Sequence, residues 1–289
     1  MPVRNLVRSL AAALAATCIA WSPASAATPA APALRATYEK LAPDLANSPL
    51  GRPMVLKSAE TGAGLKGEVY GVLDHPLSEF RANLVKPTRW CEMLMLHVNN
   101  RACRVDEARK TLTLSVVRRY DIPVEEAFEL TFQVRVNATP DHFDAKLSSG
   151  KGPFGTRNYL ISVEGIPLDG GKSFVHFSYT YEQGSATRVA TKTYLSTLGR
   201  DKVGFTVVGK EPNGDPKLIG DMLGLVERNA MRYFLALDAY LGAPNNFEKR
   251  LTLWYAATQK YPRQLSDLSE ADYLKFKRMD RARQGKAHP

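Results

Sequence analysis

The sequence predicts an α+β fold in which a curved antiparallel sheet carries one long helix across one of its faces. Residues 128–136 alternate between apolar and polar side chains, which is typical of a strand with one buried face. The alternating segments 157–165 and 173–182 flank a DGG turn at residues 169–171 and predict a hairpin. Residues 216–241 instead carry an apolar side chain every three or four positions, which predicts a helix. Strands followed by a helix favour the α+β class.

The N-terminus has the order of a secretory signal peptide. Arg4 and Arg8 precede an apolar segment at residues 10–21, and small residues end at Ala26. This apolar segment is shorter than the roughly 20 residues that a membrane-spanning helix needs. We therefore expect cleavage after Ala26 and a periplasmic or secreted protein, with a retained membrane anchor as the alternative.

The chain is basic and carries a net positive charge. It has 39 Lys and Arg residues against 29 Asp and Glu, a formal charge of +10, and cleavage would remove Arg4 and Arg8. A basic exported protein can contact anionic lipid head groups or polysaccharide, and a basic surface that serves only solubility is the alternative. We expect no nucleic-acid partner outside the cytoplasm.

Cleavage would also remove Cys18 and leave Cys91 and Cys103 in an oxidising compartment. Two cysteines in such a chain are expected to form a disulfide, which would stabilise the fold by about 3 kcal/mol. Free thiols and a metal site are the alternatives. A structural zinc site needs four ligands, and this stretch offers at most three: Cys91, Cys103 and His97. His97 lies in an apolar run and is expected to be packed in the core. We expect no metal ion and no cofactor.

The remaining elements follow in chain order. Residues 27–34 form a Pro/Ala linker, and residues 35–46 predict a short helix. Residues 66–74 predict a strand, and Pro76 begins a helix that runs towards Trp90. Further strands are expected at 111–118, 142–147 and 202–208, with an inserted helix within 185–200.

The C-terminal segment predicts two extra helices. Gly242 and Pro244 end the long helix, one helix follows around residues 247–261, and Ser269 opens a second. The second helix is rich in cations: Lys275, Lys277, Arg278, Arg281, Arg283 and Lys286. These cations are candidates for peripheral contact with an anionic membrane surface, and a solvated basic helix is the alternative. The chain thus divides into a signal peptide (1–26), a linker with a short helix (27–59), a domain (60–242) and a helical basic tail (243–289).

Three features together carry a resemblance to a known superfamily: the opening strand KGEVYGVLDHP with its helix from Pro76, the strands between Thr111 and Val208, and the long helix Pro216–Leu241. This layout resembles the START-like superfamily, also called the helix-grip or Bet v 1-like fold, which includes polyketide cyclase-type domains. The resemblance covers about residues 60–242 and suggests an exported bacterial member. The chain departs from a minimal domain in its N-terminal stretch, its cysteine pair and its tail.

The resemblance implies a deep, mostly apolar cavity between the sheet and the long helix that holds lipids or other hydrophobic molecules. We therefore expect an exported protein that binds a lipid or another hydrophobic small molecule. Because some relatives are cyclases or hydrolases and others bind proteins, an enzyme using the same cavity and a cell-envelope interaction module are the alternatives. The sequence does not indicate the ligand or the oligomeric state.

Six residues are candidate ligand contacts: Arg157, Tyr159, Phe177, Tyr179, Asn229 and Tyr233. Alternation would place Arg157 on the same strand face as Tyr159, with an outward-facing arginine as the alternative. Asn229 falls on the apolar stripe of the long helix and needs a polar partner.

No residue is assigned as catalytic, because the chain contains neither a Gly-x-Ser-x-Gly nor a His-Glu-x-x-His motif. An enzyme would need an inward-facing titratable pair such as Glu227 with His176 or Arg157. Arg228 and Arg232 share one face of the long helix, which we expect to face solvent.

Overall fold

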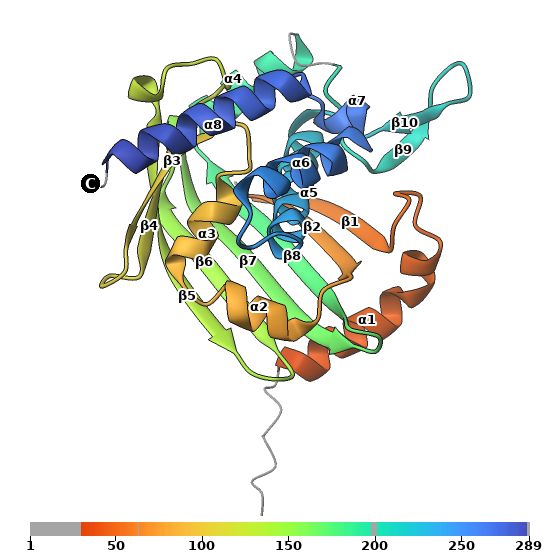
Figure 1. Cartoon of the computed structure of the whole chain (residues 1–289). Helices are drawn as coiled ribbons and strands as arrows, with labels where there is room; N and C mark the ends of the chain where they lie inside the picture. The colour runs from red at the N-terminus through yellow and green to blue at the C-terminus, as the bar shows by residue number, and fades with distance from the viewer. Residues whose placement is uncertain (1–29, 63, 198–200, 288–289) are drawn as a thin grey trace, which may run out of the picture.

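A single antiparallel sheet of eight strands forms the centre of the protein (Figure 1). The structure is a computed structural model that describes residues 30–62, 64–197 and 201–287, so the expected signal peptide lies outside the described residues. The strand order is β1-β2-β8-β7-β6-β5-β4-β3. Their bounds are β1 (Met54–Thr61), β2 (Gly64–Leu73), β3 (Asn100–Asp106), β4 (Thr111–Val116), β5 (Phe128–Ala138), β6 (Phe143–Lys151), β7 (Thr156–Leu168) and β8 (Lys172–Gln183). The predicted α+β class and antiparallel sheet are confirmed.

Helices cover both faces of this sheet. On the inner face, α5 (Asp221–Leu241) packs against β1, β2 and β8, and α2 (Leu77–Asn83), α3 (Pro87–Leu94) and α6 (Phe247–Gln259) lie around it (Figure 1). α8 (Glu270–Ala287) crosses beside the edge strand β3, and the short helix α7 (Pro262–Leu265) precedes it. α1 (Ala30–Ala46) packs its leucines on the outer face, against Ile166 and Phe174.

Two glycines in β2 let α5 approach the sheet closely. A Cβ atom at Gly67 would lie 2.7 Å from the carbonyl oxygen of Val226, and one at Gly71 would lie 2.6 Å from the ring of Phe234. Both distances are too short for a side chain. The apolar stripe of α5 therefore reaches the sheet because β2 carries no side chain at these two positions.

Several boundaries differ from those expected. β1 begins at Met54, ahead of the expected domain start at residue 60, and α1 begins at Ala30, within the expected linker. The helix from Pro76 is two helices, because the chain turns before Pro87, which begins α3. β9 (Val207–Lys210) pairs with β10 (Pro216–Leu218) in a separate hairpin, so the expected strand at 202–208 does not extend the large sheet. The inserted helix is α4 (Ser185–Ser196).

The C-terminal helices pack into the same hydrophobic core as the sheet and α5. Trp254 of α6 and Tyr273 of α8 are buried in the same hydrophobic cluster as the sheet residues. Much of the basic segment is engaged within the protein: Lys277 is buried and donates to the carbonyl oxygens of His97 and Asn100, and Arg278 pairs with Glu248.

The predicted disulfide is confirmed. Cys91 in α3 is bonded to Cys103 in β3, with their Cα atoms 5.7 Å apart, so the bond ties the helix to the edge strand. His97 is buried within this loop, as expected. Within the described ranges, none of the helices has the length and apolar character to cross a membrane.

Candidate functional site

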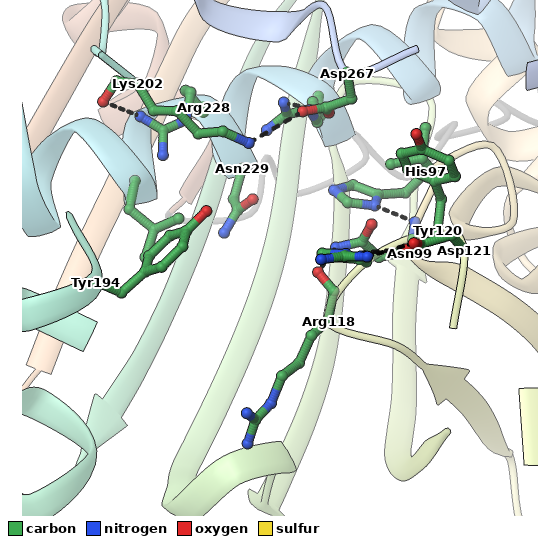
Figure 2. A pocket seen from close by; sticks show the side chains of 14 residues that line it. His97, Asn99, Arg118, Tyr120, Asp121, Tyr194, Lys202, Arg228, Asn229 and Asp267 are labelled. Atoms are coloured by element: carbon green, nitrogen blue, oxygen red, sulfur yellow. Dashed lines mark hydrogen bonds and ion pairs between the residues drawn. The ribbon is translucent and has the colours of Figure 1, made fainter. Parts of the chain in front are cut away.

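A pocket of about 390 Å³ lies beside α5, and we call it the α5 pocket (Figure 2). Its walls are the turn before β3 at residues 97–99, the loop after β4 at residues 118–121, Tyr194 of α4, one face of α5, and Asp267 before α8. Pockets that hold small molecules in proteins span about 300–1,000 Å³. The α5 pocket therefore has the size of a ligand site.

The face of α5 that lines the pocket is set by helical spacing. Leu225, Arg228, Asn229 and Arg232 stand at positions i, i+3, i+4 and i+7, so they project to one side of the helix. The expectation that Arg228 and Arg232 face solvent is wrong, because their exposed fractions are only 3% and 6%. α4 and the segment at residues 202–203 cover this side of the helix, so both guanidinium groups line an enclosed wall.

Arg228 is a buried cation without a carboxylate partner among the described residues. Its Nη1 donates to the carbonyl oxygens of Lys202 at 2.7 Å and Val203 at 3.3 Å. Burial, and then the nearby charge of Arg232, lowers the pKa of Arg228 to about 10. The charged form of Arg228 is thus destabilised by its surroundings.

Among the described residues, Arg232 pairs with one carboxylate, which it shares with a second cation. Its Nη2 donates to Oδ2 of Asp267 at 2.6 Å, and Nζ of Lys202 lies 3.6 Å from Oδ1 of the same residue. Nε of Arg232 is buried and has no acceptor within the described part of the chain. Asp267 therefore offsets only part of the charge on this wall.

The α5 pocket as a whole is positively charged. Its walls hold five cations, namely Arg118, Arg119, Lys202, Arg228 and Arg232, against the carboxylates of Asp121 and Asp267. Burial, then Arg232 and Lys277, holds the pKa of His97 well below its usual value, so the imidazole adds no charge at neutral pH. Asp121 is already bound by Arg119.

A cluster of tyrosines lies between the sheet and α5, adjacent to the α5 pocket. Tyr159 of β7 stacks on Tyr181 of β8 with ring centroids 5.2 Å apart, and Tyr179 lies 5.7 Å from Tyr233 of α5. Tyr233 also stacks at 4.9 Å on His97, which lines the pocket. Burial raises the pKa of Tyr233 to about 12 and that of Tyr179 well above its usual value, so both hydroxyls stay protonated.

The pocket and the tyrosine cluster are electrostatically linked through Arg228. Burial and the neighbouring Tyr159 raise the pKa of Tyr181, and the charge of Arg228 opposes this rise. Arg228 therefore acts electrostatically on Tyr181 of this cluster and also lines the α5 pocket.

Five of the six candidate ligand residues lie in this region. Tyr159, Phe177, Tyr179 and Tyr233 belong to the buried aromatic cluster. Asn229 lines the α5 pocket, and Figure 2 shows its amide directed into the open space between Tyr194 and Arg118. No acceptor or donor within the described residues bonds to this amide, so Asn229 meets no protein partner there.

Arg157 is the exception: the face shared with Tyr159 is wrong for it, and the alternative, an outward-facing arginine, is confirmed. The pairing of β7 with β8 shifts register between Arg157 and Leu160, with Asn158 at a φ of 52°. This extra residue is a β-bulge, which turns Arg157 to the outer face of the sheet. There its Nε donates to Oε2 of Glu182 at 2.9 Å, and it lies outside the α5 pocket.

The suggested titratable pair of Glu227 with His176 or Arg157 does not form. Glu227 points inward and is fully buried, where it accepts hydrogen bonds from Ser58, Phe205 and Thr206. His176 lies on the outer face, 2.9 Å from Oε1 of Glu68 and 3.3 Å from Oε2 of Glu164. The sheet separates the two groups. Within the described ranges, no three His, Cys, Asp or Glu side chains are arranged to hold a metal ion.

Sequence reasoning missed Lys202, Asp267 and the loop at residues 118–121 as parts of the site. These residues come from separate connections, and no local pattern relates one to another. The pair Arg118-Arg119 directly after a strand was the one available signal.

Comparison with known proteins gives similarity to solved structures only. No family model matches the chain. No curated protein matches it either. A protein from Arthrobacter aurescens aligns at 11% identity over 66% of this chain and 94% of its own, with a TM-score of 0.37. Ara h 8.0201 aligns at 10% identity over 62% and 99%, with a TM-score of 0.36. A point mutant of norcoclaurine synthase from Thalictrum flavum, in complex with a transition-state analogue, aligns at 12% identity over 51% and 87%, with a TM-score of 0.33. Similarity at this level identifies no activity or ligand for this chain.

Proposed function

We propose that this protein binds a lipid-like small molecule in the α5 pocket. The observation that carries the proposal is the pocket itself, which has ligand size, lies against the long helix and exposes the unpartnered amide of Asn229. Binding sites for small molecules combine apolar walls with a few polar groups that orient the ligand. The α5 pocket combines Val98, Leu225 and two tyrosines with a larger set of polar and charged side chains.

The apolar part of the ligand would contact Val98, Tyr120, Tyr194 and Leu225, which line the pocket between its charged groups. Tyr194 is 45% exposed and lines the pocket, so a bound ligand would cover part of its ring. Burial of apolar surface stabilises such a complex by about 25 cal/mol per Å².

The proposal includes export to the periplasm. The N-terminal sequence up to Ala26 supports it, and so does the Cys91–Cys103 disulfide, because disulfides persist in oxidising compartments. Membrane association through the basic segment would then rest on its exposed cations Lys275 and Arg281, since Lys277 and Arg278 have partners within the protein.

The test is to express the full chain with its own N-terminus in a bacterium, purify the periplasmic protein, and identify co-purifying molecules by organic extraction and mass spectrometry. A panel of lipids and fatty acids is then screened by thermal shift. Leu225→Trp, which fills the pocket, is expected to lose the ligand and the shift, whereas Val189→Trp on the exposed surface of α4 keeps both. Recovery of no ligand together with no thermal shift would contradict the proposal.

A further inference from the structure

Three cations of the α5 pocket, Lys202, Arg228 and Arg232, lie next to one another and are only partly neutralised by the described residues. Arg228 and Arg232 stand one helical turn apart on α5, and Lys202 adjoins both, because its carbonyl accepts from Arg228 and its amine approaches Asp267. Within the part of the chain that the structure describes, one carboxylate, Asp267, pairs with members of this group of three. Like charges so placed repel one another, and each raises the cost of keeping the next one charged.

Arg228 retains donors that the protein does not use. Within residues 30–62, 64–197 and 201–287, its hydrogen bonds run from Nη1 to two carbonyl oxygens, and Nε and Nη2 donate to no acceptor. A guanidinium group buried without a carboxylate is costly to the fold. The buried guanidinium of Arg228 therefore contributes little to stability unless an anionic partner binds it.

The neighbouring side chain offers a second set of unused donors in the same pocket. Asn229 follows Arg228 on the helix, and its amide is directed into the open space of the pocket (Figure 2). A planar guanidinium binds a carboxylate or phosphate through two parallel hydrogen bonds, and an adjacent amide N–H can donate a third. The unused groups therefore match the acceptors of an oxyanion.

We infer that the ligand of the α5 pocket is an apolar molecule with one anionic oxygen group, a carboxylate or a phosphate, bound by Arg228 and Asn229 with Lys202 and Arg232 adding positive charge. The inference rests on the proposed function, because it names the chemical class of the ligand in that same pocket. The apolar part then lies along Leu225 and Tyr194, which line the same pocket.

The test uses ligands that share a ten-carbon chain and differ only in the head group: decanoate, decyl phosphate, decanol and decyltrimethylammonium. Their affinities for the full mature protein are measured by isothermal titration calorimetry. We expect decanoate or decyl phosphate to bind at least about ten-fold more tightly than decanol, and decyltrimethylammonium to bind most weakly, because a charge-assisted hydrogen bond is roughly twice as strong as a neutral one. The better of the two anions identifies the head group as carboxylate or phosphate.

Arg228→Gln is expected to weaken anion binding by about 10- to 100-fold and to leave decanol binding unchanged. If this variant does not fold, Lys202→Gln replaces it, because Lys202 is half exposed and its loss should weaken anion binding about three-fold. Arg263→Gln, an exposed residue of α7 outside the pocket, is the matched control and should bind like the wild type.

Two failures can be told apart. Equal affinity for decanol and the anions, or an Arg228→Gln variant that binds the anions normally, would overturn the inference and leave the proposed function standing. Absence of binding by every ten-carbon ligand, together with no co-purifying molecule, would overturn both.

Discussion

Thr206 donates two hydrogen bonds to the carboxylate of Glu227, one from its backbone N–H at 3.1 Å to Oε2 and one from its hydroxyl at 2.6 Å to Oε1. The N–H of Phe205 and the hydroxyl of Ser58 complete the set, at 2.6 and 2.7 Å. Glu227 thus joins α5 to β1 and to the segment that leads into β9. Since Arg228 donates to carbonyl oxygens of the same segment, Glu227 also fixes one wall of the α5 pocket.

Replacement of Glu227 should give graded losses of stability. In Glu227→Gln the remaining carbonyl oxygen can still accept from the two backbone N–H groups, and the new amide can donate to the two hydroxyls, so we expect a loss of about 1 kcal/mol. Glu227→Leu leaves both N–H groups buried without an acceptor and should cost about 3 kcal/mol. Urea unfolding of both variants, with the exposed Glu125→Gln as control, measures these values. Equal losses for Gln and Leu would contradict this account.

The packing of α5 on β2 gives a second prediction. Gly67→Ala places a Cβ atom 2.7 Å from the carbonyl oxygen of Val226, so the helix must shift, and we expect a loss of about 1–3 kcal/mol. Gly150→Ala in β6 is the matched control, because nothing lies within 4 Å of its added Cβ atom. The measurement is the midpoint of thermal or urea unfolding for the two variants. A Gly67→Ala protein as stable as Gly150→Ala would show that α5 does not lie this close to the sheet.

Elements with one buried face were predictable from the sequence, because burial imposes a period on the residues. β5, the β7–β8 hairpin and α5 all follow this rule. β9 does not, since Val207 and Val208 are both more than half exposed, and a strand without a buried face carries no alternation that specifies its partner. Its pairing with β10 therefore could not be inferred.

The candidate site was only partly predictable for two physical reasons. Alternation along a strand fails at a bulge, and the extra residue at Asn158 reversed the face expected for Arg157. Helical spacing placed Arg228 and Arg232 on one face correctly, but which neighbour covers that face depends on α4 and on residues 202–203. Helical spacing shows which residues share a face of a helix. It does not show which other segments of the chain cover that face.

The Cys91–Cys103 disulfide gives a third prediction. It closes a loop with a sequence separation of 12, and the double variant Cys91→Ser with Cys103→Ser should lose about 3 kcal/mol of unfolding free energy. Urea unfolding with and without a thiol reductant tests this, since the reductant should destabilise the wild type and leave the double variant unchanged. Two freely alkylated thiols in protein exported to the periplasm would contradict the pairing.

The buried ion pair between α8 and β3 gives a fourth prediction. Asp280 is fully buried and accepts from Nε of Arg101 at 2.9 Å, and it lies 3.6 Å from Nζ of Lys277. Asp280→Asn leaves two buried cations without a carboxylate and should cost about 3–5 kcal/mol. Burial already lowers the pKa of Lys277 to about 8, and loss of Asp280 should lower it further. Glu270→Gln, at the exposed start of α8, is the control for urea unfolding, and equal stability of the two variants would show that α8 is not anchored by Asp280.

The outer-face group around His176 gives a fifth prediction, for the dependence of stability on pH. Burial lowers the pKa of His176, but hydrogen bonds to Glu164 and Glu68 outweigh burial and leave this pKa above its usual value of 6.5. For Glu68, burial raises the pKa, and hydrogen bonds from His176 and Lys66 outweigh it and lower the pKa to about 2. The two carboxylates of Glu68 and Glu164, which both contact the imidazole, therefore favour its protonated form.

The signs of these shifts fix the direction of the effect. A histidine whose pKa is raised on folding contributes stability that is fully present below its unfolded pKa and is lost as pH rises through the folded value. The unfolding free energy of the wild type should therefore exceed that of His176→Gln most at about pH 6, and this difference should shrink towards pH 9. Glu68, whose pKa is lowered on folding, should also contribute to the unfolding free energy, and this contribution should be lost as pH falls from about 4.5 towards 2. An NMR titration of His176 that gives a midpoint below 6.5, or a difference between the two proteins that grows with rising pH, would show that the two carboxylates do not hold the proton on the imidazole.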